Sequence, residues 1–320
     1  MFYLVLFLLS LVLTYTMITI AKNNAMMAEV NERSSHTAPT PHGGGIAIAI
    51  TWFIGITYLF IYDTLSLQLY LTLLLGFFLA LVSFLDDLYE INPKVRLVIH
   101  TFISFLALLF LGGLDTINLY FFTIENQFIT NLIALIMMVW FINLYNFIDG
   151  IDGYAGMQGV FMGIAGFLLF NDNLFLVLAV SVLGFLVFNW QKAKIFMGDV
   201  GSTLLGFNIA VFTIYYNNQD GSLMLWLILF ALFWFDATYT LIRRIINKEK
   251  ITQAHKKHLY QRMVQSGWSH QKVTLFALCL NIIIFFLLSV GYNIFFTFIQ
   301  VLILLSIITI LIEKRKPFAH

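Results

Sequence analysis

Residues 66–87 read SLQLYLTLLLGFFLALVSFLDD, an apolar run that ends in two adjacent aspartates. A run of this length can cross a hydrocarbon core of about 30 Å as an α-helix. Comparable runs recur along all 320 residues, of which 61% are hydrophobic and only 10% are charged, and the mean hydropathy is +0.91. The composition therefore indicates an integral membrane protein, and no pattern typical of nucleic-acid binding is present.

Apolar length and turn signals predict eleven membrane-spanning segments. The predicted spans are 2–20, 44–62, 66–85, 95–113, 127–146, 155–170, 174–189, 203–217, 222–242, 273–290 and 293–312. A backbone inside lipid must satisfy its own hydrogen bonds, so we expect each span to be helical. Because the joints are short, we expect one all-α polytopic domain over 1–320, within which 243–272 is the largest cytoplasmic loop.

Lysine and arginine residues predict the orientation of this bundle. When the joints are numbered alternately, all 17 of these residues fall on one side and none on the other. The positive-inside rule makes that side cytoplasmic, with the N-terminus outside and the C-terminus inside. Several acids cluster on the same side. They are Asp86, Asp87, Glu90, Asp149, Asp152 and Asp199. Charge is costly in a membrane protein, so these clusters are candidates for a functional site.

The first acidic cluster, Asp86-Asp87, lies where one predicted span ends and the next begins. Adjacent carboxylates repel each other, so both stay ionised at low cost only near a cation. A divalent metal would supply that charge, or the pair would exchange a proton during general-base catalysis. The alternative is a solvated helix end whose acids balance Lys94 and Arg96.

The second cluster is the segment 146–153, which reads NFIDGIDG. Its glycines allow positive φ angles and close approach of the backbone to a ligand. Asn146 offers both a donor and an acceptor, whereas Asp149 and Asp152 only accept. A polar turn that happens to be acidic is the alternative, and two Asp-Gly pairs three residues apart make it the weaker one.

The third cluster, 198–202, reads GDVGS and places Asp199 between glycines. Mg²⁺ binds one or two protein carboxylates together with phosphate oxygens and water, so a sparse acid of this kind suits it. Near the second span, His42 precedes the glycine run 43–45. The amides of such a run could bind an anion at a helix N-terminus, or the glycines could permit close helix packing.

The 243–272 loop holds eight of the 17 basic residues. At helical spacing, His258 and Arg262 share one face and His255 lies one turn behind. Together they would form a cationic wall suited to a diphosphate. An amphipathic helix on anionic lipid is an equally good interpretation of this segment.

Asp236 is the one acid placed within a predicted span. An acid in this position usually lines a cavity or pairs with a base. We expect Arg243 or Arg244, two turns further along the chain, to be its structural partner.

These motifs together resemble the polyprenyl-phosphate N-acetylhexosamine-1-phosphate transferase family, of the glycosyltransferase family 4 type. The resemblance rests on Pro41–Gly45, Asp86-Asp87, Asn143–Gly153, Phe196–Ser202, Asp236 with Arg243-Arg244, and His255–His258. It covers nearly the whole chain. His255 and His258 are separated by two lysines, and eleven spans with a cytoplasmic tail are predicted. Both features resemble the branch that initiates the synthesis of O-antigen or teichoic acid. They are less similar to the phospho-N-acetylmuramoyl-pentapeptide transferase branch.

The resemblance implies an Mg²⁺-dependent enzyme, with Mn²⁺ as an alternative metal, that crosses the bacterial inner membrane many times and works at its cytoplasmic face. Undecaprenyl phosphate would attack a UDP-N-acetylhexosamine to give the lipid-diphosphate sugar and UMP. The sugar would be N-acetylglucosamine or a 6-deoxy relative such as N-acetylfucosamine. This would be the first membrane step of O-antigen or related surface polysaccharide synthesis. Membrane lipid and a second copy of the chain are the other expected partners, and nucleic acid is not expected.

The resemblance also assigns roles to individual residues. Asp199 is the implied Mg²⁺ ligand, and Asp86 with Asp87 would deprotonate or orient the lipid phosphate. The implied nucleotide or diphosphate contacts are Asn146, Asp149, Asp152 and Asn189. The remaining predicted substrate-binding residues are Lys94, His255, His258, Arg262 and His42.

Three alternative functions stay open at this point. One is transfer of phospho-muramoyl-pentapeptide in peptidoglycan synthesis. Another is an aspartate-rich membrane prenyltransferase, which the spacing of Asp149 and Asp152 mimics but the third cluster at Asp199 does not. The last is a transporter, which would place ionisable residues near the bilayer midplane rather than at its edge.

Overall fold

Helices form almost the whole structure. The computed structural model describes residues 1–23, 27–28, 39–62, 64–89, 91–251, 253 and 255–318. Its helices are α1 (Phe2–Asn23), α2 (Gly45–Ile61), α3 (Leu67–Tyr89), α4 (Pro93–Phe110), α5 (Gln127–Ile148), α6 (Tyr154–Phe170), α7 (Asn173–Asn189), α8 (Gly198–Asp220), α9 (Leu223–Leu229), α10 (Ala231–Ile246), α11 (Leu259–Gln265), α12 (His270–Val290) and α13 (Ile294–Arg315). Three charged residues of the predicted joints lie outside the described residues, namely Arg33, Asp63 and Glu90.

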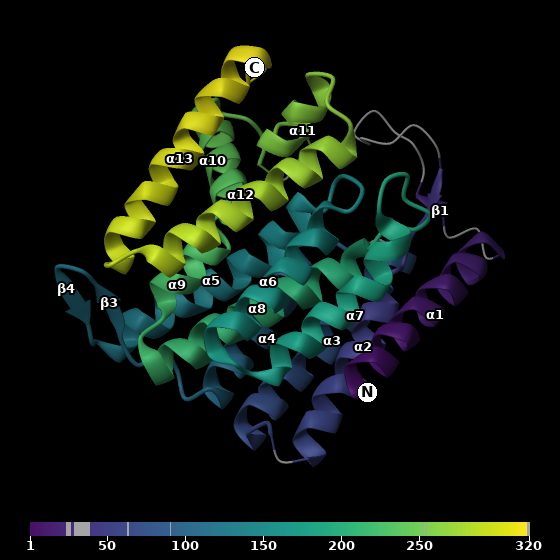
Figure 1. The fold of residues 1–320 in the computed structure, drawn as a ribbon, viewed down its shortest axis with the longest axis horizontal. Helices are drawn as coiled ribbons and strands as arrows, with labels where there is room; N and C mark the ends of the chain where they lie inside the picture. The colour runs from purple at the N-terminus through teal and green to yellow at the C-terminus, as the bar shows by residue number, and fades with distance from the viewer. Residues whose placement is uncertain are drawn as a thin grey trace.

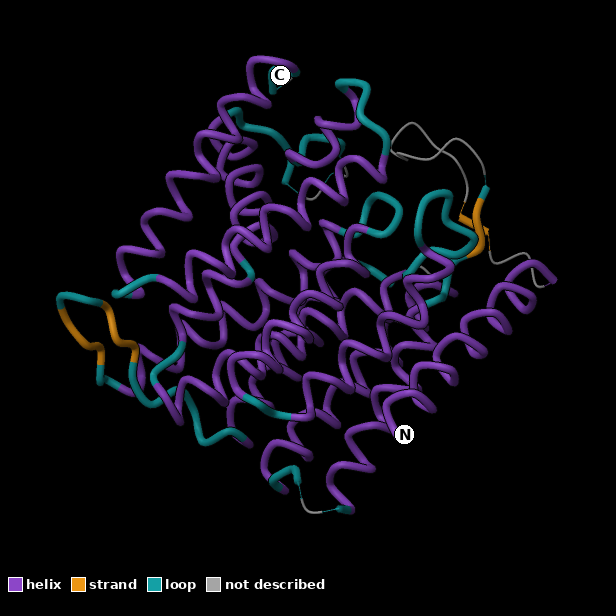
Figure 2. The backbone as a smooth tube through the Cα atoms, in the orientation of Figure 1, coloured by secondary structure: helices purple, strands orange, loops and turns teal. Residues whose placement is uncertain are grey.

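Among the described residues, two short antiparallel strand pairs interrupt the helical pattern (Figure 2). β1 (Met27–Ala28) pairs with β2 (Thr40–Pro41), and β3 (Ile117–Leu119) pairs with β4 (Phe122–Ile124). Neither pair was predicted. Both lie in joints, so the all-α prediction for the predicted spans is confirmed. In Figure 1 the β3–β4 hairpin and α11 lie toward opposite ends of the helices.

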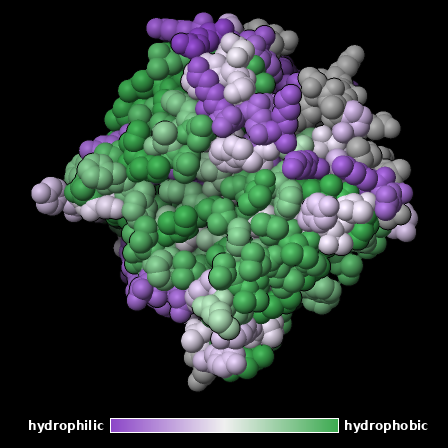
Figure 3. Space-filling model, turned by 45° about the vertical axis from the view of Figure 1, so that its right-hand side comes forward, coloured by the Kyte–Doolittle hydropathy of each residue, from purple (hydrophilic) through white to green (hydrophobic). Residues whose placement is uncertain are grey.

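Length and composition make many of these helices able to cross a membrane. In the described part of the chain, six helices are long and apolar enough, namely α1, α3, α4, α5, α12 and α13. The bent pair α9–α10 would be a seventh. Three apolar helices, α2, α6 and α7, have 17 residues each. At 1.5 Å per residue they are only about 25 Å long. Hydrophobic residues cover the centre of the face in Figure 3, as expected for a surface in lipid.

The predicted span 222–242 is wrong as a single straight helix. The chain forms α9 and α10 instead, with a bend of 79° between them. The ring of Phe230 is fully buried at the break and packs 5.0 Å from the ring of Phe141 on α5. The indole of Trp234 donates to the carbonyl of Leu227 across the break at 2.7 Å. Tertiary packing therefore breaks this helix, without the proline or glycine that usually marks a kink.

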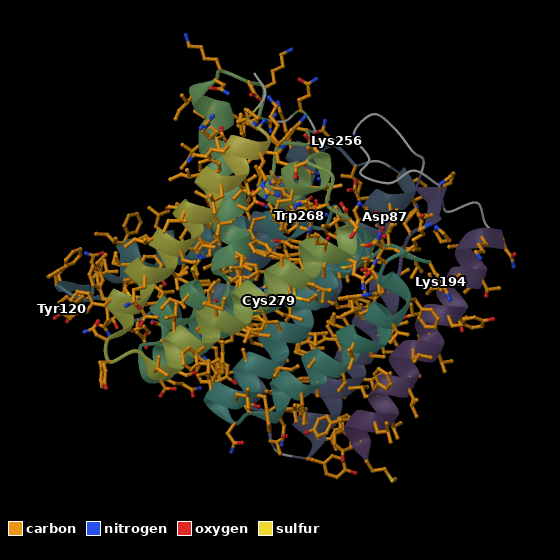
Figure 4. All side chains as sticks on the ribbon, turned by 45° about the horizontal axis from the view of Figure 1, so that its top comes forward. Asp87, Tyr120, Lys194, Lys256, Trp268 and Cys279 are labelled. Atoms are coloured by element: carbon orange, nitrogen blue, oxygen red, sulfur yellow. The ribbon has the colours of Figure 1, made fainter. Side chains whose placement is uncertain are left out.

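Helix α8 lies at the centre of the bundle. Its residues are buried along nearly its whole length, and it packs against α2, α3 and α5. The N-terminus of α8 carries Asp199, and the elements around it carry the other acidic motifs. This arrangement explains how clusters more than 100 residues apart in the sequence meet at one end of the helices. Figure 4 shows Asp87 far from Tyr120, which belongs to the β3–β4 turn.

Candidate active site

The turn between α3 and α4 is built by its own polar side chains. The amide of Ile91 donates to Asp86 Oδ1 at 2.7 Å. Asn92 caps α4, because its side chain accepts from the amide of Lys94 at 2.9 Å, and Pro93 supplies the first helical position. Proline is favoured there because its missing N–H would have no partner anyway. The turn therefore fixes where Arg96 leaves the first turn of α4.

Arg96 joins the first and third acidic clusters. Its guanidinium forms an ion pair with Asp86 and a second one with Asp199 Oδ2 at 2.8 Å. From the other side, Asn146 Nδ2 donates to Asp199 Oδ1 at 2.7 Å and to Ser202 Oγ at 3.0 Å. Four helices, α3, α4, α5 and α8, thus converge on the carboxylate of Asp199.

Asp87 and His42 lie beside the same carboxylate. Gly198 has a φ of 74°, and a Cβ placed on it would lie 3.3 Å from Asp87 Oδ2 and 3.4 Å from the amide nitrogen of Gly43. Gly198 therefore permits both the left-handed turn into α8 and the close approach of Asp87. Burial lowers the pKa of His42, and the negative charge of Asp199 offsets part of that shift.

The glycine run before α2 serves helix packing. The amides of Gly44 and Gly45 donate to the carbonyls of Phe196 at 2.9 Å and Met197 at 2.7 Å. These two amides are therefore not available to an anion, which corrects that interpretation of the run. A Cβ on Gly45 would lie only 2.2 Å from the amide nitrogen of Gly201, so the glycines let α2 and α8 touch.

We expect Gly45→Ala to destabilise the protein by about 3 kcal/mol, because the added methyl meets backbone atoms that cannot rotate away. Transferase activity should fall with it, since α8 carries Asp199. The measurement is the thermal unfolding midpoint of the purified protein in detergent. Gly159→Ala is the matched control, because its Cβ would meet side-chain atoms at 3.2 Å. Equal midpoints for the two variants would contradict the role of this contact.

The loop between α5 and α6 is tied to two neighbouring segments. Asn189 is 3% exposed, accepts from the amide of Gly153 at 3.0 Å and donates to the carbonyl of Ile195 at 2.9 Å. Asp152 is buried, and its Oδ2 lies 3.3 Å from His270 Nδ1. Gly153 has a φ of 73°, as expected for a glycine at this turn. Asn189 and Asp152 thus position this loop, and their contact with a nucleotide stays a prediction.

The donor set suits a cation that phosphate also coordinates. Burial raises the pKa of Asp149 to about 7, and the negative charge of Asp199 adds to that shift. Among the described residues, no three His, Cys, Asp or Glu side chains are placed to hold a metal by themselves. Mg²⁺ needs only one or two carboxylates when water and phosphate complete its shell. Asp199, with Asp86 and Asp87 close by, meets that requirement.

Asp236 does not pair with Arg243 or Arg244, which corrects that prediction. It is 3% exposed, accepts from the amide of Leu259 at 2.8 Å and from that of Tyr260 at 3.3 Å, and its Oδ1 lies 3.3 Å from His258 Nδ1. A carboxylate at this place satisfies the amides that start α11 and suits the helix dipole. The two arginines pair instead with Glu313 and Glu249, each at 3.2 Å.

We expect Asp236→Ala to cost about 2–3 kcal/mol of folding free energy, because it leaves two buried amides and His258 without their acceptor. The loss is measured as a lower thermal unfolding midpoint, with partial loss of activity as α11 shifts. Asp220→Ala removes an exposed acid at the end of α8 and should leave the midpoint unchanged. If the thermal unfolding midpoints of Asp236→Ala and Asp220→Ala are equal, Asp236 does not stabilise the position of α11.

The predicted cationic wall is divided between separate contacts. Arg262 is 1% exposed, pairs with Glu313 and donates to the carbonyl of Lys316, so it faces the end of α13. His258 contacts Asp236. Burial, with the neighbouring His258, lowers the pKa of His255 to about 3, so its imidazole is neutral near pH 7. A substrate contact for these three residues stays a prediction.

Most of the predicted catalytic and metal residues therefore meet around Asp199. The structure adds Arg96, which the sequence indicated only as a charge balancing the acids of a helix end. Lys94 lies exposed one half-turn before it. Arg96 could have been found from its spacing, because an arginine ten residues after Asp86 returns to the same end of the bundle. No sequence signal pointed to the pairing of Asp152 with His270.

Comparisons with known proteins show similarity to one group of transferases. Residues 69–217 match the family model described as glycosyl transferase family 4. A probable undecaprenyl-phosphate N-acetylglucosaminyl 1-phosphate transferase of Bacillus subtilis is 28% identical over 96% of this chain and 91% of its own length. An undecaprenyl-phosphate alpha-N-acetylglucosaminyl 1-phosphate transferase of Thermotoga maritima is 24% identical over 92% of this chain and 91% of its own. A phospho-N-acetylmuramoyl-pentapeptide-transferase of Thermotoga petrophila is 28% identical over 76% of this chain and 82% of its own.

The matched segment contains the residues that converge at the start of α8, from Asp86 to Asp199, and the similarity to transferases extends beyond it on both sides. Over residues 69–217 the chain is therefore similar to glycosyl transferase family 4.

Proposed function

We propose that this protein transfers N-acetylhexosamine 1-phosphate from a UDP-sugar to undecaprenyl phosphate, giving the lipid-diphosphate sugar and UMP. One observation supports this proposal most strongly. Arg96 forms ion pairs with both Asp86 and Asp199, and Asn146 donates a hydrogen bond to Asp199. These residues lie within the segment that matches the family. The relatives from Bacillus subtilis and Thermotoga maritima are both named as undecaprenyl-phosphate N-acetylglucosaminyl 1-phosphate transferases, so N-acetylglucosamine is the first sugar to test.

Phosphoryl transfer needs positioning and charge neutralisation more than covalent catalysis. Arg96 offers a guanidinium that can hold phosphate oxygens, because it is anchored by two carboxylates and its side chain is still 28% exposed. Asp86 and Asp87 stand beside it, where they would orient the lipid phosphate or accept its proton. Asn146, in the last turn of α5, and Asp149, at the start of the loop that follows, would face the nucleotide.

Mg²⁺ is the proposed metal, and Asp199 would hold it, with Asp86 and Asp87 near enough to share it. Bound there, the ion would neutralise charge that develops on the transferred phosphoryl group. Removal of divalent metal with EDTA should abolish transfer, and Mg²⁺, or less effectively Mn²⁺, should restore it. Full activity in EDTA would contradict the metal assignment.

The experiment that tests the function measures UMP release by the purified protein with undecaprenyl phosphate and a panel of UDP-sugars. The panel holds UDP-N-acetylglucosamine, its 6-deoxy relatives such as UDP-N-acetylfucosamine, and UDP-muramoyl-pentapeptide. Use of N-acetylglucosamine or a 6-deoxy sugar supports the proposal and an initiating role in O-antigen or related surface polysaccharides. Exclusive use of the pentapeptide would place the protein with the relative from Thermotoga petrophila. No UMP from any sugar would overturn it.

We also propose eleven spans, with the active site on the cytoplasmic face of a bacterial inner membrane. The segregation of all 17 basic residues supports this orientation. Cys279 is the single cysteine and can be replaced by serine, so new cysteines report the topology. In spheroplasts an impermeant maleimide should label Tyr120→Cys and should reach Lys256→Cys only after lysis. The reverse pattern would invert the orientation. A homodimer stays a prediction that light scattering in detergent can test.

A further inference from the structure

A cavity of about 400 Å³ opens between α11, α12 and α13, away from the candidate active site. Apolar side chains from the three helices line it, among them Met263, Phe276 and Ile308. None of its lining residues belongs to the cluster around Asp199. Its apolar wall is therefore a separate feature that the transfer reaction does not explain.

Basic residues surround one end of this cavity. Lys314 and Arg315 line it, and Lys272 lies with its ammonium 4.3 Å from the ring centroid of Trp268, which also lines it. In the part of the chain that the structure describes, these three basic side chains have no carboxylate within ion-pair distance. A cation without a partner at a cavity can accept a ligand's negative charge at little cost.

Neighbouring basic residues show a different arrangement. Arg243 and Arg262 both pair with Glu313, which precedes Lys314 on α13, and Lys257 pairs with Glu249 at 2.7 Å. The acids of this region are thus used by basic residues that hold the fold together. Lys314 and Arg315, which line the cavity, are not among these paired residues.

The cavity also lies at the ends of helices that are able to cross a membrane, which is where a lipid headgroup is expected. It spans the last turn of α13 and the first turns of α12, both apolar helices long enough to cross a membrane. Tryptophan and lysine at such a helix end are typical of the membrane interface, where the ring and stem lie in the apolar layer and the charge reaches water. Figure 4 shows Trp268 toward the same end of the helices as Lys256.

We propose that this cavity binds an anionic membrane phospholipid. Its acyl chain would lie along Met263, Phe276 and Ile308, and its phosphate would contact Lys314 and Arg315. An anionic headgroup is favoured over a zwitterionic one because each basic residue near an anionic lipid surface contributes about 1 kcal/mol. The occupant is a bilayer lipid rather than the lipid substrate, since the cavity lies on helices that do not carry the acidic cluster.

The test uses the full-length protein in detergent with lipids that carry bromine on their acyl chains, which quench nearby tryptophan. The quenching of Trp268 alone is the difference between the unmodified protein and Trp268→Phe, and it reports on lipid in the cavity. Brominated phosphatidylglycerol should quench Trp268 at about tenfold lower concentration than brominated phosphatidylcholine. In Lys314→Gln/Arg315→Gln, the phosphatidylglycerol midpoint should rise about thirtyfold, which is the effect of two charges at about 1 kcal/mol each.

The matched control is Lys248→Gln/Lys250→Gln, which removes two exposed basic residues that do not line the cavity and should leave the midpoint unchanged. Ile308→Phe fills the apolar part and should weaken quenching by both lipids, so the proposal has a second variant if the first one misfolds. Equal midpoints for the two lipids, or equal shifts in both double variants, would overturn it. So would displacement of phosphatidylglycerol by undecaprenyl phosphate at much lower concentration. The readout is lipid binding, so it is independent of the proposed transfer.

Discussion

Asp199→Asn is expected to lower transfer of sugar phosphate to undecaprenyl phosphate by about 10³-fold. Asp199 is the carboxylate on which Arg96 and Asn146 converge, at 2.8 Å and 2.7 Å. An amide has nearly the same shape but no negative charge, so the variant removes the proposed metal ligand and the partner of Arg96 together. Loss of one preorganised electrostatic contact typically costs 10²–10³ in rate, and loss of a metal costs more.

Activity is measured as UMP release, and Mn²⁺ binding is measured in parallel by electron paramagnetic resonance, where weaker binding is expected. Asp115→Asn serves as the control, because Asp115 is an exposed aspartate in the joint that leads to the β3–β4 hairpin. Thermal unfolding of both variants should resemble that of the unmodified protein. If Asp199→Asn keeps activity within about fivefold of the control, the metal lies elsewhere.

The sequence predicted the helices well because apolar length is a local property. Each predicted span overlaps a helix, and α4 starts at Pro93, two residues before the predicted span 95–113. The break at Phe230 could not be predicted, because it depends on the ring of Phe141 from a helix about ninety residues earlier. Sequence patterns record the helix that a segment prefers, whereas tertiary packing decides whether it stays straight.

The acidic residues of the candidate site could be predicted from the sequence, because acidic clusters are rare in a membrane protein. Asp86, Asp149 and Asp199 stood out by charge alone, and their meeting follows from the central position of α8. The basic residues were harder to assign, because a positive charge at a membrane edge has several uses. Arg262 is buried against Glu313, whereas Lys314, the residue after Glu313, lines an open cavity.

Arg96→Gln is expected to lower transfer by about 10²-fold while making the metal bind more tightly. The variant removes a positive charge that contacts both Asp86 and Asp199. Without the guanidinium, the negative charges of the two carboxylates repel each other. A divalent cation that binds there relieves this repulsion, so its binding free energy becomes more favourable. Transfer falls nevertheless, because the variant lacks the guanidinium that would donate hydrogen bonds to the phosphate oxygens.

The two active-site variants should therefore move Mn²⁺ affinity in opposite directions, weaker in Asp199→Asn and about tenfold tighter in Arg96→Gln, although both lose activity. Lys248→Gln removes an exposed lysine and controls for a general change in net charge. A role for Arg96 in folding alone would instead lower the unfolding midpoint and weaken Mn²⁺ binding in step with activity. Opposite shifts in metal affinity at unchanged stability are expected of an arginine that lies between metal-binding carboxylates, and parallel losses would remove Arg96 from the site.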